Sequence, residues 1–242
     1  MPYSNCSAEP TFLQRNPHIE ILRQMPVFSP LDPVTLRDIY RRMTVKRWYG
    51  GAIIVGQEEP GDAFYVVVKG QTREVLFGEN GREMTLSTLG EGDFFGAMAL
   101  LDGKARSANV VAVDDVVLLS MRRDTFFACL EAHPQVAMRL LAEMSLKLRA
   151  ANELINNLAL HDVSSRLMRT LVNLAEQTGD LRDDGIFISR RPTQQELANM
   201  VGTCRETVSR ALSSMSRKGL VVCRGRSLFL SRALVDSLQK AA

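Results

Sequence analysis

The sequence predicts an α+β protein in three parts: an antiparallel β-roll of jelly-roll type, one long helix, and a smaller C-terminal part of short helices and a strand pair. Three observations support this prediction. Turn signals recur through the first half, the apolar spacing becomes a heptad near residue 134, and the charge balance changes sign after residue 159. The expected divisions are an N-terminal extension (1–19), the β-roll (20–133), the long helix (134–160) and the C-terminal part (161–242).

The composition is that of a folded globular protein. Of the 242 residues, 45% are hydrophobic and 24% are charged. The longest apolar runs are far shorter than the roughly 20 residues that a membrane-spanning helix needs. The four cysteines show no C-x-x-C spacing, so neither a zinc ribbon nor a disulfide framework is indicated. We therefore expect a cytoplasmic chain with no membrane partner and no bound metal.

The charge is distributed unevenly along the chain. Residues 1–159 contain 17 Lys and Arg against 19 Asp and Glu, whereas residues 160–242 contain 13 against 8. A basic final third behind a mildly acidic body suggests a polyanionic partner for that third. A chance asymmetry on solvated faces remains the alternative.

The first half has the pattern of many short strands. Segments rich in β-branched and aromatic residues, such as 63–68 and 109–113, alternate with glycine-containing turns. Asn80-Gly81 is a strong signal for a two-residue hairpin. Short strands at this spacing predict a sandwich or jelly roll.

The long helix follows Pro134, which suits a first helical turn. From Ala137 to Leu158, apolar residues recur at alternating steps of four and three, the pattern of a coiled-coil seam. We expect a parallel homodimer along this helix, with packing on its own domain as the alternative. The predicted interface consists of Leu141, Met144, Leu148, Ala151, Ile155 and Leu158.

The C-terminal part contains two short helices separated by a glycine turn. Thr193 with Glu196 forms a capping box, Gly202 ends that helix, and Thr203 with Glu206 predicts a second capping box. This is the helix-turn-helix arrangement. Two strands with a basic turn between them follow, in the place of a wing.

The second of these helices carries the residues expected to contact base edges in the major groove. Arginine matches the two acceptors of guanine, and glutamate accepts from cytosine. Glu206 has capping alone as its alternative role. The predicted DNA-binding residues are Thr193, Thr203, Arg205, Glu206, Ser209, Arg210 and, for phosphate, Arg224 and Arg226.

The stretch from Thr193 to Arg210 resembles the helix-turn-helix of the CRP/FNR family of transcription regulators. Residues 92–100, followed by Arg106-Ser107-Ala108, look like the phosphate-binding cassette of cyclic-nucleotide-binding domains. Residues 157–163 are similar to the family's hinge. The resemblance spans about residues 20–232 and implies a winged helix-turn-helix at the C-terminus.

The cassette also has a physical basis of its own. A glycine turn into a short helix points backbone N–H groups at an anion, and Arg106 supplies a guanidinium for a phosphodiester. A surface role for Arg106 is the alternative. The predicted ligand-binding residues are Gly96, Ala97, Met98, Ala99, Arg106, Ser107, Ala151 and Asn152.

Three of these positions depart from the pattern of cyclic-AMP-binding members. Ala97 stands where the family usually has a glutamate for the ribose hydroxyl, and Ala151 and Asn152 stand where Thr and Ser meet adenine. Such a charged hydrogen bond contributes roughly 1.5–3 kcal/mol. We therefore favour cyclic di-GMP or cyclic GMP over cyclic AMP. Weak cyclic AMP binding and a ligand-independent regulator with a relic pocket stay open.

Other members of the family bind haem or an iron–sulfur cluster, and neither is expected here. Only Cys6 lies near the N-terminus, and His18, His133 and His161 lie off the predicted core strands. No phosphate loop, zincin motif or nucleophile–base pair indicates an enzyme. The resemblance implies palindromic DNA with TGTGA-like half-sites, and RNA polymerase is a further candidate partner. The alternative from another class is a cyclic-nucleotide-responsive subunit that regulates a partner protein.

Overall fold

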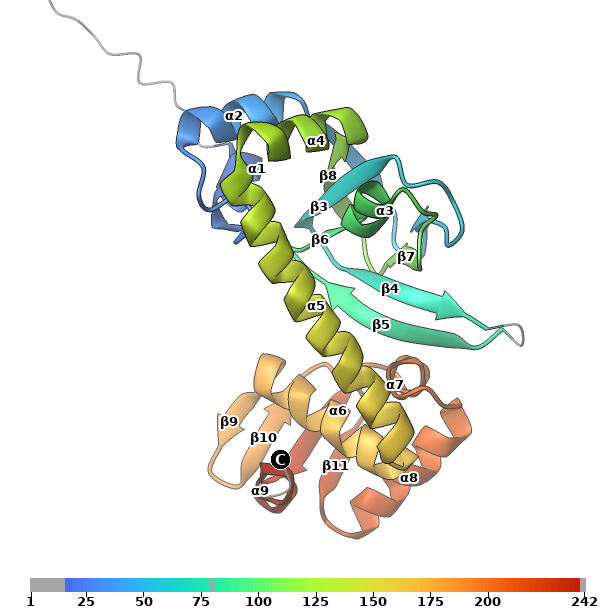
Figure 1. Ribbon diagram of the computed structural model, residues 1–242. Helices are drawn as coiled ribbons and strands as arrows, with labels where there is room; N and C mark the ends of the chain where they lie inside the picture. The colour runs from blue at the N-terminus through green and yellow to red at the C-terminus, as the bar shows by residue number, and fades with distance from the viewer. Residues whose placement is uncertain (1–15, 79–80, 240–242) are drawn as a thin grey trace, which may run out of the picture.

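The computed structural model describes residues 16–78 and 81–239. A β-rich N-terminal part lies at one end, the long helix α5 crosses the molecule, and the C-terminal part lies at the other end (Figure 1). The N-terminal strands are β1 (Thr44–Trp48), β2 (Ile53–Val55), β3 (Ala63–Lys69), β4 (Thr72–Phe77), β5 (Glu83–Leu89), β6 (Phe94–Phe95), β7 (Asn109–Ala112) and β8 (Val116–Arg122).

These strands form two four-stranded sheets, in the orders β1-β8-β3-β6 and β2-β7-β4-β5, and all their pairings are antiparallel. Strand β3 is apolar on both faces because it lies between two cores. Tyr65 and Val67 face the core between the sheets, whereas Phe64 and Val66 belong to a second core under the helices. The predicted antiparallel β-rich domain is confirmed. Gly81 lies at the predicted hairpin between β4 and β5, and Asn80 lies outside the described residues.

The described part of the N-terminal half also contains four helices before α5: α1 (Pro17–Gln24), α2 (Pro33–Arg41), α3 (Ala97–Asp102) and α4 (Arg123–Ala132). Of these four, only α3 was predicted, as the short helix of the cassette. The sequence pattern predicted no helix at the positions of α1, α2 and α4. Asp32 caps α2 by accepting from the N–H groups of Val34 and Thr35, a local signal that the strand pattern obscured.

The long helix α5 spans Pro134–Leu160, with Pro134 in its first turn. Val136 and Leu140 are buried in the core that α1, α2 and α4 share with one face of the sheet. The helix then continues to the C-terminal part (Figure 1). It is therefore the covalent link between the two ends of the molecule.

The C-terminal part packs helices on a four-stranded sheet of order β11-β12-β10-β9. Its elements are α6 (Val163–Thr178), β9 (Asp180–Arg182), β10 (Gly185–Ile188), α7 (Gln194–Val201), α8 (Arg205–Arg217), β11 (Val221–Arg224), β12 (Ser227–Ser231) and α9 (Arg232–Gln239). Strands β9 and β10 pair as a further hairpin, which the sequence pattern did not predict.

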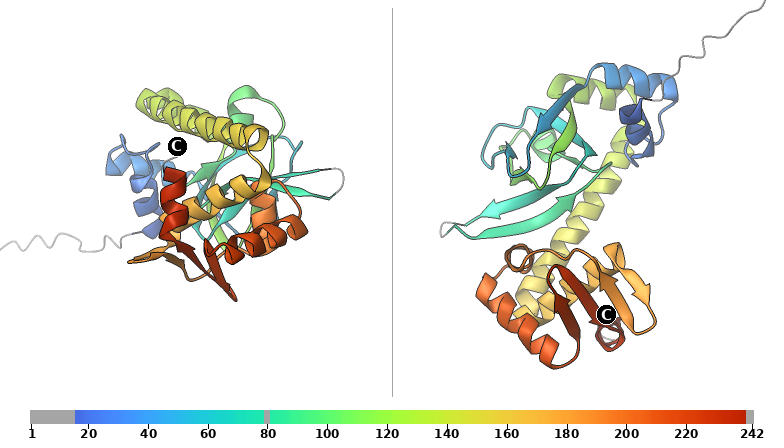
Figure 2. Two further views of the ribbon diagram at one scale, coloured as in Figure 1. Left: turned by 90° about the horizontal axis from the view of Figure 1, so that it is seen from below. Right: turned by 180° about the vertical axis from the view of Figure 1, so that it is seen from behind.

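The two ends of the molecule also touch away from α5. The β4–β5 hairpin reaches down to α7, as both views from the side show (Figures 1 and 2). Among the described helices, none is both long and apolar enough to span a bilayer.

Candidate functional site

A cavity of about 390 Å³ lies between the β-roll and α5. Its walls come from β2, β4, β5, β6, the start of α3, the loop before β7, and one face of α5. Seven of the eight predicted ligand residues line it, namely Gly96, Ala97, Met98, Ala99, Arg106, Ser107 and Ala151. Asn152 does not line it, and its side chain lies on the exposed side of α5.

The turn into α3 depends on a glycine. Gly96 has a φ of 87°, and a Cβ there would lie 2.5 Å from an Arg106 nitrogen and 2.7 Å from the carbonyl oxygen of Ala63. Only glycine tolerates both this backbone conformation and this approach. The chain therefore brings the first N–H groups of α3 and the Arg106 guanidinium to one end of the cavity.

Arg106 is part of the fold as well as of the cavity. Its side chain is 4% exposed, and it donates to the carbonyl oxygens of Gly96 (2.9 Å) and Ala63 (2.8 Å). Burial lowers the pKa of the guanidinium, and the negative charges of Asp62 and Glu59 oppose this shift. A guanidinium remains charged in proteins and has five N–H donors, so three remain for an anion after the two carbonyls. The surface role considered for Arg106 is thereby excluded.

A second polar group lies in the cavity, and no sequence motif predicted it. Glu74 on β4, Ser87 on β5 and Lys147 on α5 all line it. Ser87 Oγ donates to Glu74 Oε2 (2.5 Å), and Lys147 Nζ lies 3.9 Å from the same oxygen and donates to the carbonyl oxygen of Phe94 (3.1 Å). These residues are far apart in the sequence and match no motif. Only the register of β4 with β5, which pairs Glu74 with Ser87, could have indicated part of the group.

The outer face of α5 is apolar and exposed. Leu141, Leu148, Ile155 and Leu158 of the predicted seam are all exposed large hydrophobic residues. Met144 differs, because it is half-buried against its own β-roll and lines the cavity. Met144 and Ala151 belong to the predicted seam and also line the cavity, so the apolar stripe of α5 adjoins the cavity wall.

The helix-turn-helix forms as expected at its first helix. Thr193 Oγ1 accepts from the Glu196 N–H (3.2 Å), and a Glu196 oxygen accepts from the Thr193 N–H (2.6 Å), which completes the capping box. Burial by itself raises the pKa of Glu196. The hydrogen bonds from Thr193 and the nearby Arg73 and Arg226 cations outweigh burial, so its pKa lies below the ordinary value.

The second capping box is wrong. Helix α8 begins at Arg205 after Cys204, which makes no side-chain capping bond. The Thr203 N–H instead bonds to the Ala198 carbonyl (3.0 Å) as the last link of the turn around Gly202, whose φ is 67°. Thr203 therefore belongs to the end of α7, and it lies half-buried. The Glu206 carboxylate accepts hydrogen bonds from its own backbone N–H and from the Cys204 side chain. These bonds lower the pKa of the carboxyl group.

The predicted base-contacting residues share one face of α8. Arg205, Glu206 and Arg210 are exposed, and Ser209 is half-buried. On the opposite face Val208 is fully buried against Ala198 of α7, in the core of the C-terminal part. Helices α7 and α8 therefore pack together in this core.

The basic turn between β11 and β12 adjoins this face. Arg205, Arg226 and Thr193 line one shallow hollow together with Arg191, which the sequence analysis missed. Arg191 donates to the carbonyl oxygens of Pro192 (3.0 Å) and Gly225 (3.2 Å). It thereby fixes the tip of the wing against the start of α7. The adjacent Arg190-Arg191 pair was the sequence signal for it.

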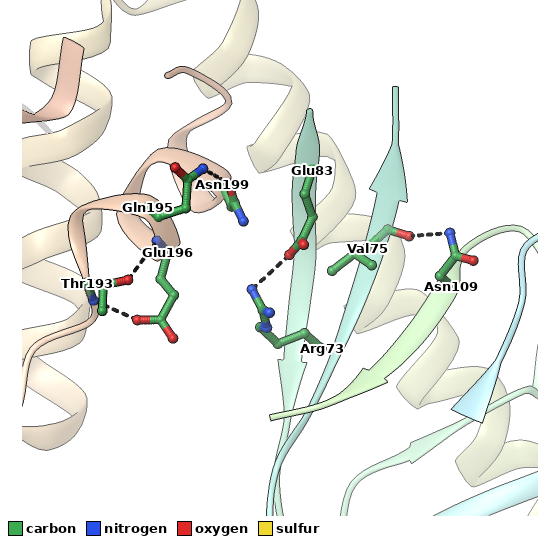
Figure 3. A network of polar contacts seen from close by, with 8 residues as sticks. All are labelled: Arg73, Val75, Glu83, Asn109, Thr193, Gln195, Glu196 and Asn199. Atoms are coloured by element: carbon green, nitrogen blue, oxygen red, sulfur yellow. Dashed lines mark hydrogen bonds and ion pairs between the residues drawn. The ribbon is translucent and has the colours of Figure 1, made fainter. Parts of the chain in front are cut away.

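The β4–β5 hairpin packs on the same helix-turn-helix. In Figure 3 the ion pair between Arg73 and Glu83 (2.8 Å) faces the side chains at the start of α7. A Cβ on Gly202 would lie 3.2 Å from Met84 Sδ and 3.1 Å from a methyl group of Leu158. Strand β5 therefore reaches from the cavity, at Ser87, to the turn of the helix-turn-helix.

Possible metal ligands do not cluster in the described part of the chain. Over residues 16–78 and 81–239, no group of three or more His, Cys, Asp or Glu side chains is placed to hold an ion. Cys129, Cys204 and Cys223 are free. Burial raises the pKa of Cys129 to about 11, so its thiol stays protonated near neutral pH. Cys6 lies outside the described residues.

A β-roll with a cassette-lined cavity, joined by a long helix to a winged helix-turn-helix, defines an effector-responsive transcription regulator. Two family models match this chain, "Cyclic nucleotide-binding domain" over residues 45–133 and "Crp-like helix-turn-helix domain" over residues 165–233. The chain belongs to the CRP/FNR family of transcription regulators.

Individual relatives support the same family. The chain is 32% identical over 202 residues to the cAMP-activated global transcriptional regulator CRP of Escherichia coli, covering 83% of this chain and 95% of that protein. It is 27% identical over 212 residues to the CRP-like cAMP-activated global transcriptional regulator of Mycobacterium tuberculosis, covering 88% and 95%.

Solved structures show the same fold. The c-di-GMP responsive global regulator CLP of Xanthomonas campestris has a TM-score of 0.74 at 22% identity and covers 83% of this chain and 99% of that one. The catabolite activator protein of Thermus thermophilus has a TM-score of 0.52 at 31% identity, covering 89% and 99%.

Proposed function

We propose that this protein is a homodimeric DNA-binding regulator whose affinity for DNA is controlled by a cyclic nucleotide in the cavity. One observation carries the proposal: α5 is at once a wall of the cavity and the connection to the helix-turn-helix. Lys147 and Ala151 line the cavity, and the same helix ends at Leu160, directly before the Asp162 cap of α6. A ligand that contacts α5 therefore acts on the element that orients the DNA-binding part. Such coupling requires only ~1–3 kcal/mol.

The apolar outer face of α5 supports the dimer. Exposed apolar stripes of this length mark interfaces in soluble proteins. The heptad spacing of Leu141, Leu148 and Ile155 suits two parallel helices in contact. In that arrangement Asn152, which does not line its own cavity, faces the partner subunit and can offer its amide to a purine edge.

The effector we propose is a cyclic purine nucleotide, with its phosphate at Arg106, Ser107 and the N-terminus of α3. Ala97 and Ala151 both line the cavity, so the departures noted in the sequence affect the ligand directly. They place cyclic GMP and cyclic di-GMP ahead of cyclic AMP. The cavity of about 390 Å³ lies at the low end of the ~300–1,000 Å³ range of ligand pockets, which favours cyclic GMP over the larger dinucleotide. The relatives named as cAMP-activated make cyclic AMP the necessary comparison.

The DNA target we propose is a palindrome with TGTGA-like half-sites one helical turn apart, because a two-fold dimer presents two α8 helices. Arg205, Glu206, Ser209 and Arg210 supply the base contacts, and Arg224 and Arg226 supply phosphate contacts. A regulator bound at a promoter lies beside RNA polymerase, which is the further candidate partner.

The test is binding of the purified protein to a labelled TGTGA-palindrome duplex at fixed salt, without ligand and then with each of the three nucleotides. We expect one nucleotide to change DNA affinity at least five-fold, which is about 1 kcal/mol. A duplex with scrambled half-sites is the control. Equal binding with and without every nucleotide contradicts control by a cyclic nucleotide and supports a ligand-independent regulator.

The rival function is a nucleotide-responsive subunit that regulates a partner protein. The exposed arginines of α8 argue against it, since protein contacts do not require a basic recognition helix. The full chain with Arg205→Ala and Arg210→Ala separates the two. Loss of duplex binding with intact nucleotide binding supports the regulator, whereas a wild-type protein that binds nucleotide but no duplex supports the rival.

A further inference from the structure

The polar side chains of the cavity form two separate groups. Arg106 and Ser107 lie at the α3 end, and Glu74, Ser87 and Lys147 form a second group contributed by β4, β5 and α5. The rest of the wall is mainly apolar, from residues such as Val55, Leu86, Leu89, Val110 and Leu154. In an apolar pocket, a few placed polar groups decide which ligand binds and in which orientation.

Glu74 is the acceptor of the second group. Its side chain is 24% exposed, and an ionised carboxylate in such a place is unfavourable unless it is paired or hydrogen-bonded. Ser87 and Lys147 both approach Oε2. Within the described part of the chain, Oε1 receives no hydrogen bond, and a carboxylate oxygen can only accept.

Lys147 holds this carboxylate near the cassette. Its ammonium group donates to the carbonyl oxygen of Phe94, two residues before Gly96, and lies 5.1 Å from the centre of the Phe94 ring. Through Lys147, Glu74 is linked to Phe94, which lies just before the turn where we propose that the phosphate binds. Ala97, the first residue of α3, is buried and has a methyl group that accepts nothing. Near the cassette, the acceptor for a ligand donor therefore comes from β4.

We propose that Glu74 is a specificity-determining residue that accepts a hydrogen bond from the ribose 2′-hydroxyl of the effector, with Ser87 and Lys147 as its positioning residues. This assignment rests on the proposed function. In a 3′,5′-cyclic nucleotide the free 2′-hydroxyl is adjacent to the cyclic phosphate, so one acceptor near the cassette can reach it. The negative charge of Glu74 also repels phosphate, and this fixes the orientation of the ligand with its phosphate toward Arg106.

The experiment compares each nucleotide with its 2′-deoxy analogue on the full-length protein by isothermal titration calorimetry. The probes are cyclic GMP, cyclic AMP and their 2′-deoxy forms. For the wild type, we expect the deoxy analogue of the bound nucleotide to bind about ten-fold to a hundred-fold more weakly, as for loss of a hydrogen bond to a charged group.

The variants are Glu74→Gln and Glu74→Val. We expect the ratio of ribo to deoxy affinity to fall to about one in Glu74→Val and to an intermediate value in Glu74→Gln. Glu91→Gln, an exposed carboxylate outside the cavity, is the matched control and keeps the wild-type ratio. Because both ligands are measured on the same variant, a general loss of affinity does not mimic this result.

Two results overturn the assignment in different ways. A wild-type ratio that persists in both Glu74 variants, or equal weakening of both ligands, contradicts the role of Glu74 and leaves the proposed function intact. A wild-type protein that binds none of the probes overturns the assignment of Glu74. If cyclic di-GMP also leaves DNA affinity unchanged in the duplex experiment above, nucleotide control is overturned as well.

Discussion

The cavity and the DNA-binding face hold their arginines in opposite ways. Arg106 is buried, and two backbone carbonyls accept from it. Arg205 and Arg210 are exposed on a helix whose other face carries the packing. Arg106 therefore stabilises the fold and is also the proposed ligand contact, whereas an arginine on α8 is available for a partner without supporting the domain.

Both regions depend on α5, so the largest expected effect comes from breaking its outer face. Leu148→Glu places a charge on the predicted seam, where burial of an unpaired charge costs about 3–5 kcal/mol. We expect the dimer to dissociate at least a hundred-fold more readily and palindrome binding to be lost. Analytical ultracentrifugation and duplex binding measure the two effects.

Leu146→Glu is the matched control for this variant. Leu146 is 58% exposed and Leu148 is 63% exposed on the same helix, but the two side chains point in nearly opposite directions around it. Leu146→Glu should leave the dimer intact. Equal dissociation by both variants, or by neither, contradicts the seam.

The next largest effect is expected from Arg106→Lys in the cavity. This substitution keeps the positive charge but removes the planar guanidinium group. We expect nucleotide affinity to fall at least ten-fold, because lysine cannot reproduce a bidentate contact with phosphate. We also expect a loss of about 1–3 kcal/mol in the free energy of unfolding, since the carbonyls of Gly96 and Ala63 lose their donors. Calorimetric titration and denaturant unfolding give the two values.

Arg122→Lys is the corresponding control, because that side chain is 83% exposed outside the cavity. It should change neither quantity. An Arg106→Lys protein of wild-type stability that still binds nucleotide normally contradicts the dual role of Arg106.

Unlike Arg106→Lys, a substitution on the DNA-binding face should affect DNA binding and not stability. Arg205→Ala is expected to leave stability and nucleotide affinity unchanged and to cost about 1–3 kcal/mol of DNA binding, with relaxed preference at one base pair of the half-site. Duplexes substituted one position at a time measure this. Unchanged base preference contradicts the assignment of Arg205.

Arg224→Ala on the wing is the matched comparison. It should weaken all duplexes alike and reduce the salt dependence of binding by about one ion, as for a lost phosphate contact. A change of base preference in this variant instead assigns the wing to base contacts.

How far the sequence predicted these regions depends on how local their signals are. Pro134, the heptad and the Thr193–Glu196 box act within a few residues, and the helices they predict are present. Thr203 was misassigned because its N–H completes the turn after α7, a competition between two local signals. Helices α1, α2 and α4 were missed because their residues lie among strand-like segments and pack in one core with them.

The polar groups of the cavity could not be predicted in the same way. Glu74 and Lys147 are 73 positions apart, and their approach depends on how α5 lies over the β-roll. The cassette was recognisable because its glycine, helix start and arginine are close in sequence. The contact between Met84 and Gly202 is likewise a product of the tertiary fold.

The smallest expected effect concerns this last contact, which joins the two regions directly. Met84 lies on β5, three residues before the cavity residue Ser87, and packs at the Gly202 turn of the helix-turn-helix. We expect Met84→Ala to change the effect of nucleotide on DNA affinity by about 0.5–2 kcal/mol. Nucleotide affinity measured without DNA should stay within two-fold, because Met84 does not line the cavity.

Phe77→Ala is the matched control for Met84→Ala. Phe77 is an exposed apolar residue on the facing strand of the same hairpin, paired with Glu83 in register. Both variants remove apolar surface from the hairpin, but only Met84 lies at Gly202. If the hairpin transmits the state of the cavity to the DNA-binding part, the ratio of DNA affinities with and without nucleotide changes in Met84→Ala alone. An unchanged ratio in both variants leaves α5 as the connection that carries the signal.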